Sequence, residues 1–196
     1  KDAEAAYDAA SVVSKSRAVI VERYYTGRDH RVLVIDGKVA AVAERVPAHV
    51  LGDGRSTINE LIEMVNRNPR RGQGHDNVMT RIELDRSSFE LLRQQRYSLD
   101  TVLREGEICY LRATANLSTG GMAIDRTDEI HSDNIYLAVR VAKIIGLDIA
   151  GIDIVTPDIS RPLAEVGGVV VEVNAAPGFR MHTHPSQGLP RPVGEA

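Results

Sequence analysis

The chain has 196 residues, 43% of them hydrophobic, which suits one sizeable globular unit or two small lobes. Its 24 basic and 27 acidic side chains give a net charge of −3, and aromatic residues make up only 4%. This balance argues against a nucleic-acid-binding protein, which needs basic patches and stacking platforms. No run approaches the roughly 20 apolar residues of a membrane span. The single cysteine, Cys109, excludes an internal disulfide and predicts a cytoplasmic protein.

The first part of the chain predicts one helix and three strands. Residues 2–16 are rich in alanine with helical apolar spacing. The apolar run 18–25 predicts a strand that ends at Thr26-Gly27. Residues 31–43 predict a hairpin, because Asp36-Gly37 at its centre supplies the positive-φ positions of a type I′ turn.

Capping residues mark three further helices. Thr57-x-x-Glu60 is a capping box for a helix that runs to about residue 67, and Ser87-x-x-Glu90 opens a shorter one. Ser132 is expected to cap the helix 133–145, which Gly146 ends.

Polar segments connect these elements. We expect a loop over 47–55, and an ordered loop or a mobile flap over 68–77. A strand at 108–113 precedes the turn 116–121, and the proline-containing tail after Gly178 is expected to be loop or linker.

Two apolar strands carry polar side chains. Glu172 and Asn174 interrupt the valine run that begins at residue 169, and their spacing directs both side chains to one face of what we expect to be a buried central strand. In the strand 150–155, Asp153 faces away from its isoleucine neighbours. Turn signals between the two strands predict that they are antiparallel neighbours.

Asp153, Glu172 and Asn174 therefore predict a metal site. Carboxylate and carboxamide oxygens are the ligands that Mg²⁺ prefers, and polar groups on apolar strands cost free energy unless something pairs with them. Local capping or pairing of each acid is the alternative, and three oxygen ligands on two strands make it the weaker one.

Several other residues are candidates for a nucleotide site. Glu22 ends an apolar strand and could contact an adenine edge, although such a residue is more often just a strand end. Asp29 could accept from ribose hydroxyls and Arg31 could reach phosphates, with a solvated turn equally consistent.

Arg112 precedes the turn that contains Asn116, Gly120 and Gly121. An arginine beside backbone N–H groups that small residues leave accessible suits a phosphate or an acyl-phosphate, and an ordinary salt bridge is the alternative. Arg180, with His182 and His184, is expected to line a substrate pocket or to be exposed. A zinc site at the two histidines is disfavoured, because no cysteine or third ligand lies at the usual spacing.

Taken together, these segments resemble the ATP-grasp ligases, and specifically the cyanophycin synthetase branch. The most specific matches are Asn174–His182 and Asn116–Gly121. The other matching segments are 19–31, 45–49 with 52–54, 68–72, 111–115, 151–154 and 172–173.

The resemblance implies an α+β ATP-grasp fold, with a mixed or antiparallel sheet and flanking helices, and a ligase that uses ATP and Mg²⁺. ATP would phosphorylate the C-terminal carboxylate of a cyanophycin primer, and L-aspartate would attack the acyl-phosphate. The resemblance further implies a cytoplasmic, homo-oligomeric parent protein without nucleic-acid or membrane partners. By family position, Glu22 would sit at the adenine hinge and Asp29 at the ribose.

The match also predicts a domain division. Residues 1–26 would be the end of a small ATP-grasp lobe, 27–188 the C-terminal lobe, and 189–196 a linker towards a Mur-ligase-like domain. A phosphate-contacting lysine strand and a Gly-rich loop are not visible in this sequence, so we expect an excised segment with poor ATP binding and little activity alone. A glutathione-forming ATP-grasp ligase and a non-catalytic module derived from this fold remain alternatives.

Overall fold

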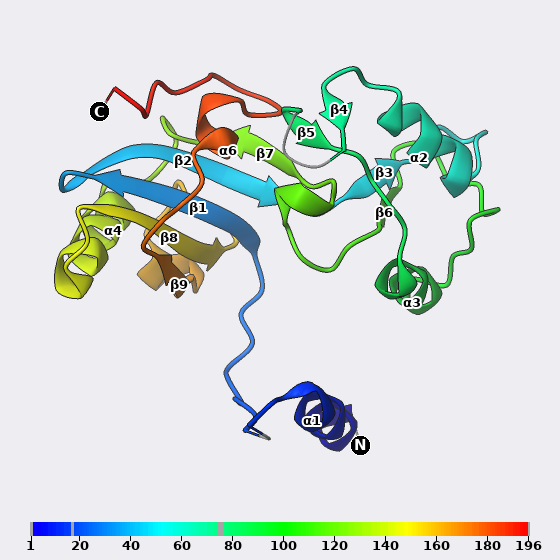
Figure 1. The fold of residues 1–196 in the computed structure, drawn as a ribbon, viewed down its shortest axis with the longest axis horizontal. Coiled ribbons are helices and arrows are strands. Elements are labelled where there is room, and N and C mark those ends of the chain that lie inside the picture. The colour runs from blue at the N-terminus through cyan, green and yellow to red at the C-terminus, as the bar shows by residue number, and fades with distance from the viewer. Residues whose placement is uncertain (1, 17, 74–76, 196) are drawn as a thin grey trace.

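A five-stranded antiparallel sheet organises the computed structural model, which describes residues 2–16, 18–73 and 77–195 (Figure 1). The spatial order of the strands is β7-β2-β1-β8-β9. Their bounds are β1 Arg28–Ile35, β2 Lys38–Val46, β7 Met122–Asp125, β8 Ile149–Thr156 and β9 Val169–Asn174. The predicted antiparallel pairing of the two strands that carry the metal-ligand candidates is confirmed.

The hairpin between β1 and β2 forms as its turn sequence predicts. Asp36 has φ 47° and Gly37 has φ 69°, which are the two left-handed positions of a type I′ turn. The two strands then pair along their whole length, with one bulge where the register shifts between Leu33 and Val34. Val34 lies opposite Val39 and Leu33 opposite Ala41, so Ala40 is the extra residue.

One face of the sheet packs against the helix α4 (Ser132–Ile145). This core contains Val32 and Val34 from β1, Ile152 and Ile154 from β8, and Ala138 with Ala142 from the helix. Fully burying one such aliphatic side chain contributes about 1.5–3 kcal/mol, so this layer fixes which face of each strand points away from the helix.

The opposite face carries a smaller apolar cluster and the polar side chains. Leu33, Ile35 and Ala41 pack there with Val193 from the C-terminal segment. The short helix α6 (Arg180–Thr183) contacts β2 and β7, and Figure 1 shows it beside these strands.

A second cluster of elements lies beyond the sheet, towards the right of Figure 1. Its own core includes Ile58, Leu92, Leu103 and Leu111. The elements are α2 Ile58–Asn66, α3 Arg86–Gln94, the antiparallel pair β3 His49–Leu51 and β6 Ile108–Tyr110, and the parallel pair β4 Arg71–Gly72 and β5 Met79–Thr80. The remaining elements of the described chain are α1 Asp2–Val13, η1 Leu117–Thr119 and α5 Leu163–Val166.

The prediction of a strand at 18–25 is wrong. These residues have no regular secondary structure, and Ile20, Val21 and Tyr24 are all exposed. A strand needs a partner for its backbone groups, and among the described residues none pairs with this run. In Figure 1, α1 and the chain that follows it stand away from the sheet.

Other local predictions were wrong in position rather than in kind. The cap of α3 is Asp85 rather than Ser87, and the cap of α4 is His131 rather than Ser132. β9 is an edge strand, not a central one, and Val171 is 56% exposed.

The strands β3 and β7 and the helix α6 were not predicted at all. No helix in the described part of the chain combines the length and apolar character that a bilayer crossing requires.

Candidate functional site

A row of five side chains, four of them charged, crosses the sheet on the face opposite α4. Glu172 lies opposite Asp153, Asp153 opposite Arg31, Arg31 opposite Ala43, and Ala43 opposite Asp125. Directly opposed residues of antiparallel strands share a face, so these five residues form one line across all five strands. The line brings together two candidates for metal ligands and one for phosphate binding.

A bulge in β9 brings Glu172 into this row. Val170 pairs with Ile154, and Glu172 pairs with the preceding residue of β8, Asp153. Val171, between them, is therefore an extra residue that has no partner of its own on β8. A regular strand would place Val170, Glu172 and Asn174 on one face. The bulge separates them, because Val170 packs into the α4 core while Glu172 joins Asp153 on the other face.

Asp153 is 2% exposed and is held by two arginines. Arg31 donates to both of its carboxylate oxygens, from Nε to Oδ1 and from Nη2 to Oδ2. Arg45 Nη2 donates to Oδ2 at 2.9 Å and to Asp29 Oδ1 at 2.5 Å. Burial acts to lower the pKa of Arg45, but the carboxylates of Asp29 and Asp153 raise it overall. The buried acid is therefore paired within the protein.

The oxygen groups of this region fit a hard cation in chemistry. Glu172 is exposed beside Asp153, and Asn174 follows two residues later, opposite Gly151. Asn174 Nδ2 lies 3.4 Å from the Gly151 carbonyl oxygen, which leaves its own side-chain oxygen for another partner. Within the described residues, no cluster of three or more His, Cys, Asp or Glu side chains could hold a metal, so a cation here would need the carboxamide as its third protein ligand.

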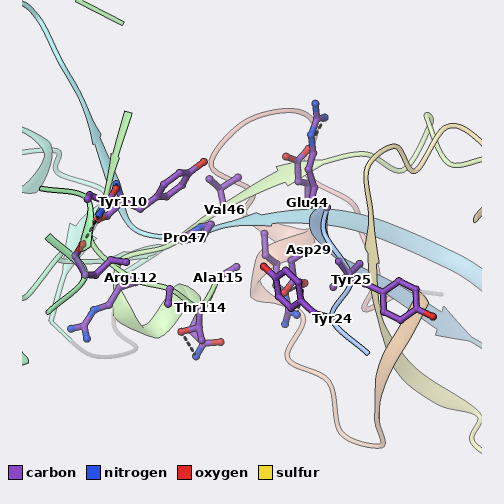
Figure 2. Close-up of a pocket in the computed structure, with 18 residues that line it drawn as sticks. Tyr24, Tyr25, Asp29, Glu44, Val46, Pro47, Tyr110, Arg112, Thr114 and Ala115 are labelled. Atoms are coloured by element: carbon purple, nitrogen blue, oxygen red, sulfur yellow. Dashed lines mark hydrogen bonds and ion pairs between the residues drawn. The ribbon is translucent and has the colours of Figure 1, made fainter. Parts of the chain in front are cut away.

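A cleft of about 710 Å³ opens between the sheet and the second cluster of elements. Figure 2 shows Tyr110 and Arg112 at one end, and Asp29 with Tyr24 and Tyr25 at the other. Arg45 and Asn116 also line it, so the cleft meets the buried ion-pair network at Arg45.

Known proteins match this chain in sequence and in fold. A model of the RimK-like ATP-grasp domain matches residues 98–187. A curated cyanophycin synthetase from Geminocystis herdmanii is 70% identical over 193 residues, 98% of this chain, and one from Trichormus variabilis is 71% identical over all 196. The chain spans 22% of the length of each of these relatives.

A solved bifunctional glutathione synthetase from Pasteurella multocida superposes with a TM-score of 0.74 at 34% identity, over 88% of this chain and 24% of that one. The chain has the ATP-grasp fold. It is related along its length to one stretch of the cyanophycin synthetases, and the glutathione enzyme is more distant.

At one end of the cleft, Arg112 makes a salt bridge with Asp85, which is the alternative that the sequence left open. It also donates to Ser87 Oγ at 3.1 Å and to the Glu83 carbonyl at 2.7 Å. The hydrogen bond from Arg112 holds the pKa of Asp85 well below its usual range. The Nε of Arg112 is buried and has no hydrogen-bond partner among the described residues, so only the two terminal nitrogens of this side chain are bonded.

The turn after Arg112 depends on close backbone contact. Asn116 lines the cleft, and its carbonyl accepts from the Gly121 N–H at 3.1 Å. Gly120 has φ 94°, which favours glycine. A Cβ on Gly121 would lie 2.7 Å from the Asn116 carbonyl oxygen and 2.9 Å from that of Val46, so only glycine fits there.

Of the predicted site residues, Asp29, Arg112 and Asn116 line this cleft, and the others do not, Glu22 and Arg180 among them. Glu22 is exposed in the irregular segment near α1, and it does not line the cleft. Arg180 on α6 donates to the Asn77 carbonyl at 3.1 Å and so contacts the 68–77 segment, of which residues 74–76 lie outside the described structure.

His182 is 2% exposed, and both of its ring nitrogens are buried without a hydrogen-bond partner among the described residues. Burial, reinforced by the charge of Arg31, lowers its pKa to about 4, although Asp125 acts in the opposite direction. His182 therefore lies in the core as a neutral ring. Its neighbour His184 is exposed, with Nδ1 2.9 Å from Thr183 Oγ1.

Sequence reasoning missed Arg45 as a site residue. Arg45 lies on β2 opposite Asp29 of β1, and its guanidinium contacts Asp153 of β8. Counting residues outward from the Asp36-Gly37 turn would pair Asp29 with Glu44 instead. The bulge at Ala40 shifts the register by one residue, so the signal is present only in the structure.

Proposed function

We propose that this chain forms part of the active site of an ATP-dependent carboxylate–amine ligase that adds L-aspartate to the backbone of cyanophycin. The observation that carries the proposal is the in-register row of Glu172, Asp153 and Arg31, with Arg45 attached to it. Two carboxylates beside two arginines, next to a cleft, suit the phosphates of a nucleotide and their counter-ion. Identity of 70% to curated cyanophycin synthetases supports the choice of substrate.

Asp153, Glu172 and Asn174 would hold Mg²⁺, which would neutralise charge on the ATP phosphates. Arg31 and Arg45 are fixed by Asp153 on one face of the sheet, so their guanidinium groups are pre-organised to contact phosphoryl oxygens. By family position, Asp29 would contact the ribose and Glu22 the adenine.

The remaining predicted residues would handle the carboxylate that is activated. Its oxygen attacks the γ-phosphorus of ATP, the bond to ADP breaks, and an acyl-phosphate results. The amine of aspartate then attacks the acyl carbon, phosphate leaves with the bonding electrons, and the amine loses a proton. Arg112, Asn116 and the backbone at Gly120 and Gly121 would stabilise the acyl-phosphate at the cleft. Arg180 would contact a substrate carboxylate. We place this reaction in the cytoplasm and in a homo-oligomeric protein.

Two alternatives are separated by experiment. A glutathione-forming ligase is disfavoured by the lower identity to the glutathione synthetase from Pasteurella multocida. A buried acid without a partner would count against a non-catalytic module, but Asp153 is paired with two arginines and so does not separate the two alternatives. The exposed Glu172 beside it is the stronger argument, because no ion pair of the described residues involves it.

The test is ADP release by the natural full-length protein with ATP, Mg²⁺ and a short aspartate–arginine primer, offering one amino acid at a time. We expect release that requires both primer and aspartate and is lost in Glu172→Gln. Glu165→Gln, which breaks only an exposed pair with Arg161, is the matched control and should retain full activity. Release with γ-glutamylcysteine and glycine instead would establish the glutathione reaction. No release with any acceptor would favour the non-catalytic module.

A further inference from the structure

Two arginines are buried within the described residues, and their environments differ. Arg31 is 7% exposed and is paired with the carboxylate of Asp153. Arg71 is 8% exposed, and Nη1 of its guanidinium donates to the Thr80 carbonyl at 2.6 Å and to the Gly120 carbonyl at 3.0 Å. No carboxylate in the described part of the chain forms a salt bridge with it.

A buried cation without a counter-charge is costly. Carbonyl dipoles offset only part of the free energy of removing a guanidinium from water, and buried charges in proteins are normally paired. Burial lowers the pKa of Arg71, and no neighbouring acid counteracts this shift. An arginine nevertheless remains protonated in a protein. The position therefore holds a positive charge that the described residues do not neutralise.

The bonding pattern shows which part of Arg71 is available. Both carbonyl contacts come from Nη1, and they fix the plane of the guanidinium. The edge formed by Nε and Nη2 makes no hydrogen bond with the described residues, and neither atom is among the fully buried polar atoms that lack a partner. This edge has the two parallel N–H groups that match a carboxylate.

The location of Arg71 connects it to the candidate site. Gly120, which accepts one of its bonds, belongs to the same turn as Asn116, and Asn116 lines the cleft. The segment that carries Arg71, which includes β4, is also tied to the segment around α6. Arg70 donates to the Pro185 carbonyl at 2.8 Å, and Arg180 donates to that of Asn77. Arg71 thus sits on a supported platform beside the turn of the cleft.

We propose that Arg71 binds a carboxylate of the amino-acid substrate through its Nε and Nη2 edge. This step rests on the proposed ligase function for the identity of the substrate, and on the unpaired buried charge for the existence of the site. The fixed Nε and Nη2 edge would match either a carboxylate or a phosphate in a bidentate contact. The proposed ligase function already assigns Arg31 and Arg45 to the phosphates, so we assign the carboxylate to Arg71.

The experiment measures binding of L-aspartate and succinate to the natural full-length protein by calorimetry, without ATP and at constant ionic strength. Phosphate and chloride serve as competing anions. We expect Arg71→Met to weaken aspartate binding by about 10- to 100-fold, which corresponds to loss of one charge-assisted pair. Arg71→Lys keeps the positive charge but lacks the two parallel N–H groups of the guanidinium, so it should recover only part of the affinity for aspartate. Arg161→Met removes an exposed cation that is paired with Glu165, and should bind aspartate within about 2-fold of the wild type.

Wild-type affinity in Arg71→Met would overturn the proposal, as would equal competition by phosphate or a wild-type protein that binds neither carboxylate. If Arg71→Met does not fold, the NMR resonance of the Arg71 Nε–H group in the wild-type protein shows whether this side chain binds the carboxylate. It should shift on addition of aspartate and not of chloride, and an unchanged resonance would reject the site. Failure of ADP release with aspartate binding intact would reject the ligase reaction and leave this site standing.

Discussion

Replacing Asp153 by asparagine should strongly destabilise the protein. The change is nearly isosteric, but it removes the carboxylate that two largely buried guanidinium groups share. Arg45 retains Asp29, whereas Arg31 has no other carboxylate among its described salt bridges. Removing one partner of a buried pair costs about 3–5 kcal/mol, because the remaining charge stays buried. For a chain of this length, that cost lowers the midpoint of thermal unfolding by roughly 10 °C.

The assay is urea unfolding followed by circular dichroism, in EDTA so that metal binding does not contribute. Asp29→Asn is the matched control, since it removes a more exposed carboxylate from the same network and should cost about 1 kcal/mol. The double variant Arg31→Met with Asp153→Asn should recover part of the loss, because it removes one of the stranded charges. A loss below about 1 kcal/mol in Asp153→Asn would refute the view that these arginines depend on this carboxylate.

Three further predictions follow from single side chains. His182→Phe should remove a pH dependence of stability. The folded pKa of His182 is about 4 and the unfolded value 6.5, so the unfolded state takes up a proton first, and wild-type stability should fall by about 3 kcal/mol as the pH drops from 6.5 to 4. The difference from His182→Phe in urea midpoints over this range checks it, and parallel curves would contradict it. Burial raises the pKa of Cys109 to about 11, with a further contribution from Glu107, so a thiol reagent at pH 8 should label it only after unfolding. Arg191→Ala should cost about 2 kcal/mol in urea, because it leaves the carboxylates of Asp125 and Asp128 without their shared partner, whereas loss of the exposed Arg86–Glu90 pair in Arg86→Ala should cost little.

Local chemistry made the hairpin and most helices predictable from the sequence. Asp36-Gly37 has few alternatives to a type I′ turn, and the capping box at Thr57 and Glu60 forms as expected. Alternation also placed Asp153 on the face away from its isoleucine neighbours. Each of these predictions depends on residues a few positions apart.

The parts that failed depend on residues far apart in sequence. The run 18–25 has the composition of a strand but no partner among the described strands, and composition does not reveal a partner. Arg45 became visible as a site residue only through its contact with Asp153 on another strand. The unpaired charge of Arg71 likewise depends on which carboxylates the fold brings near it.

The two bulges mark the positions at which β2 and β9 could lose a residue without any change in strand pairing. Ala40 and Val171 are the residues that the pairing skips, since the strands on either side continue as if each were missing. Removing either one would leave a regular strand with the same partners opposite each other. Removing a neighbour instead, such as Val173, would place the side chain of the residue that follows it in the strand, Asn174, on the opposite face of the sheet. Natural length variation in these strands should therefore concentrate at the two skipped positions, even where the surrounding residues vary freely in type.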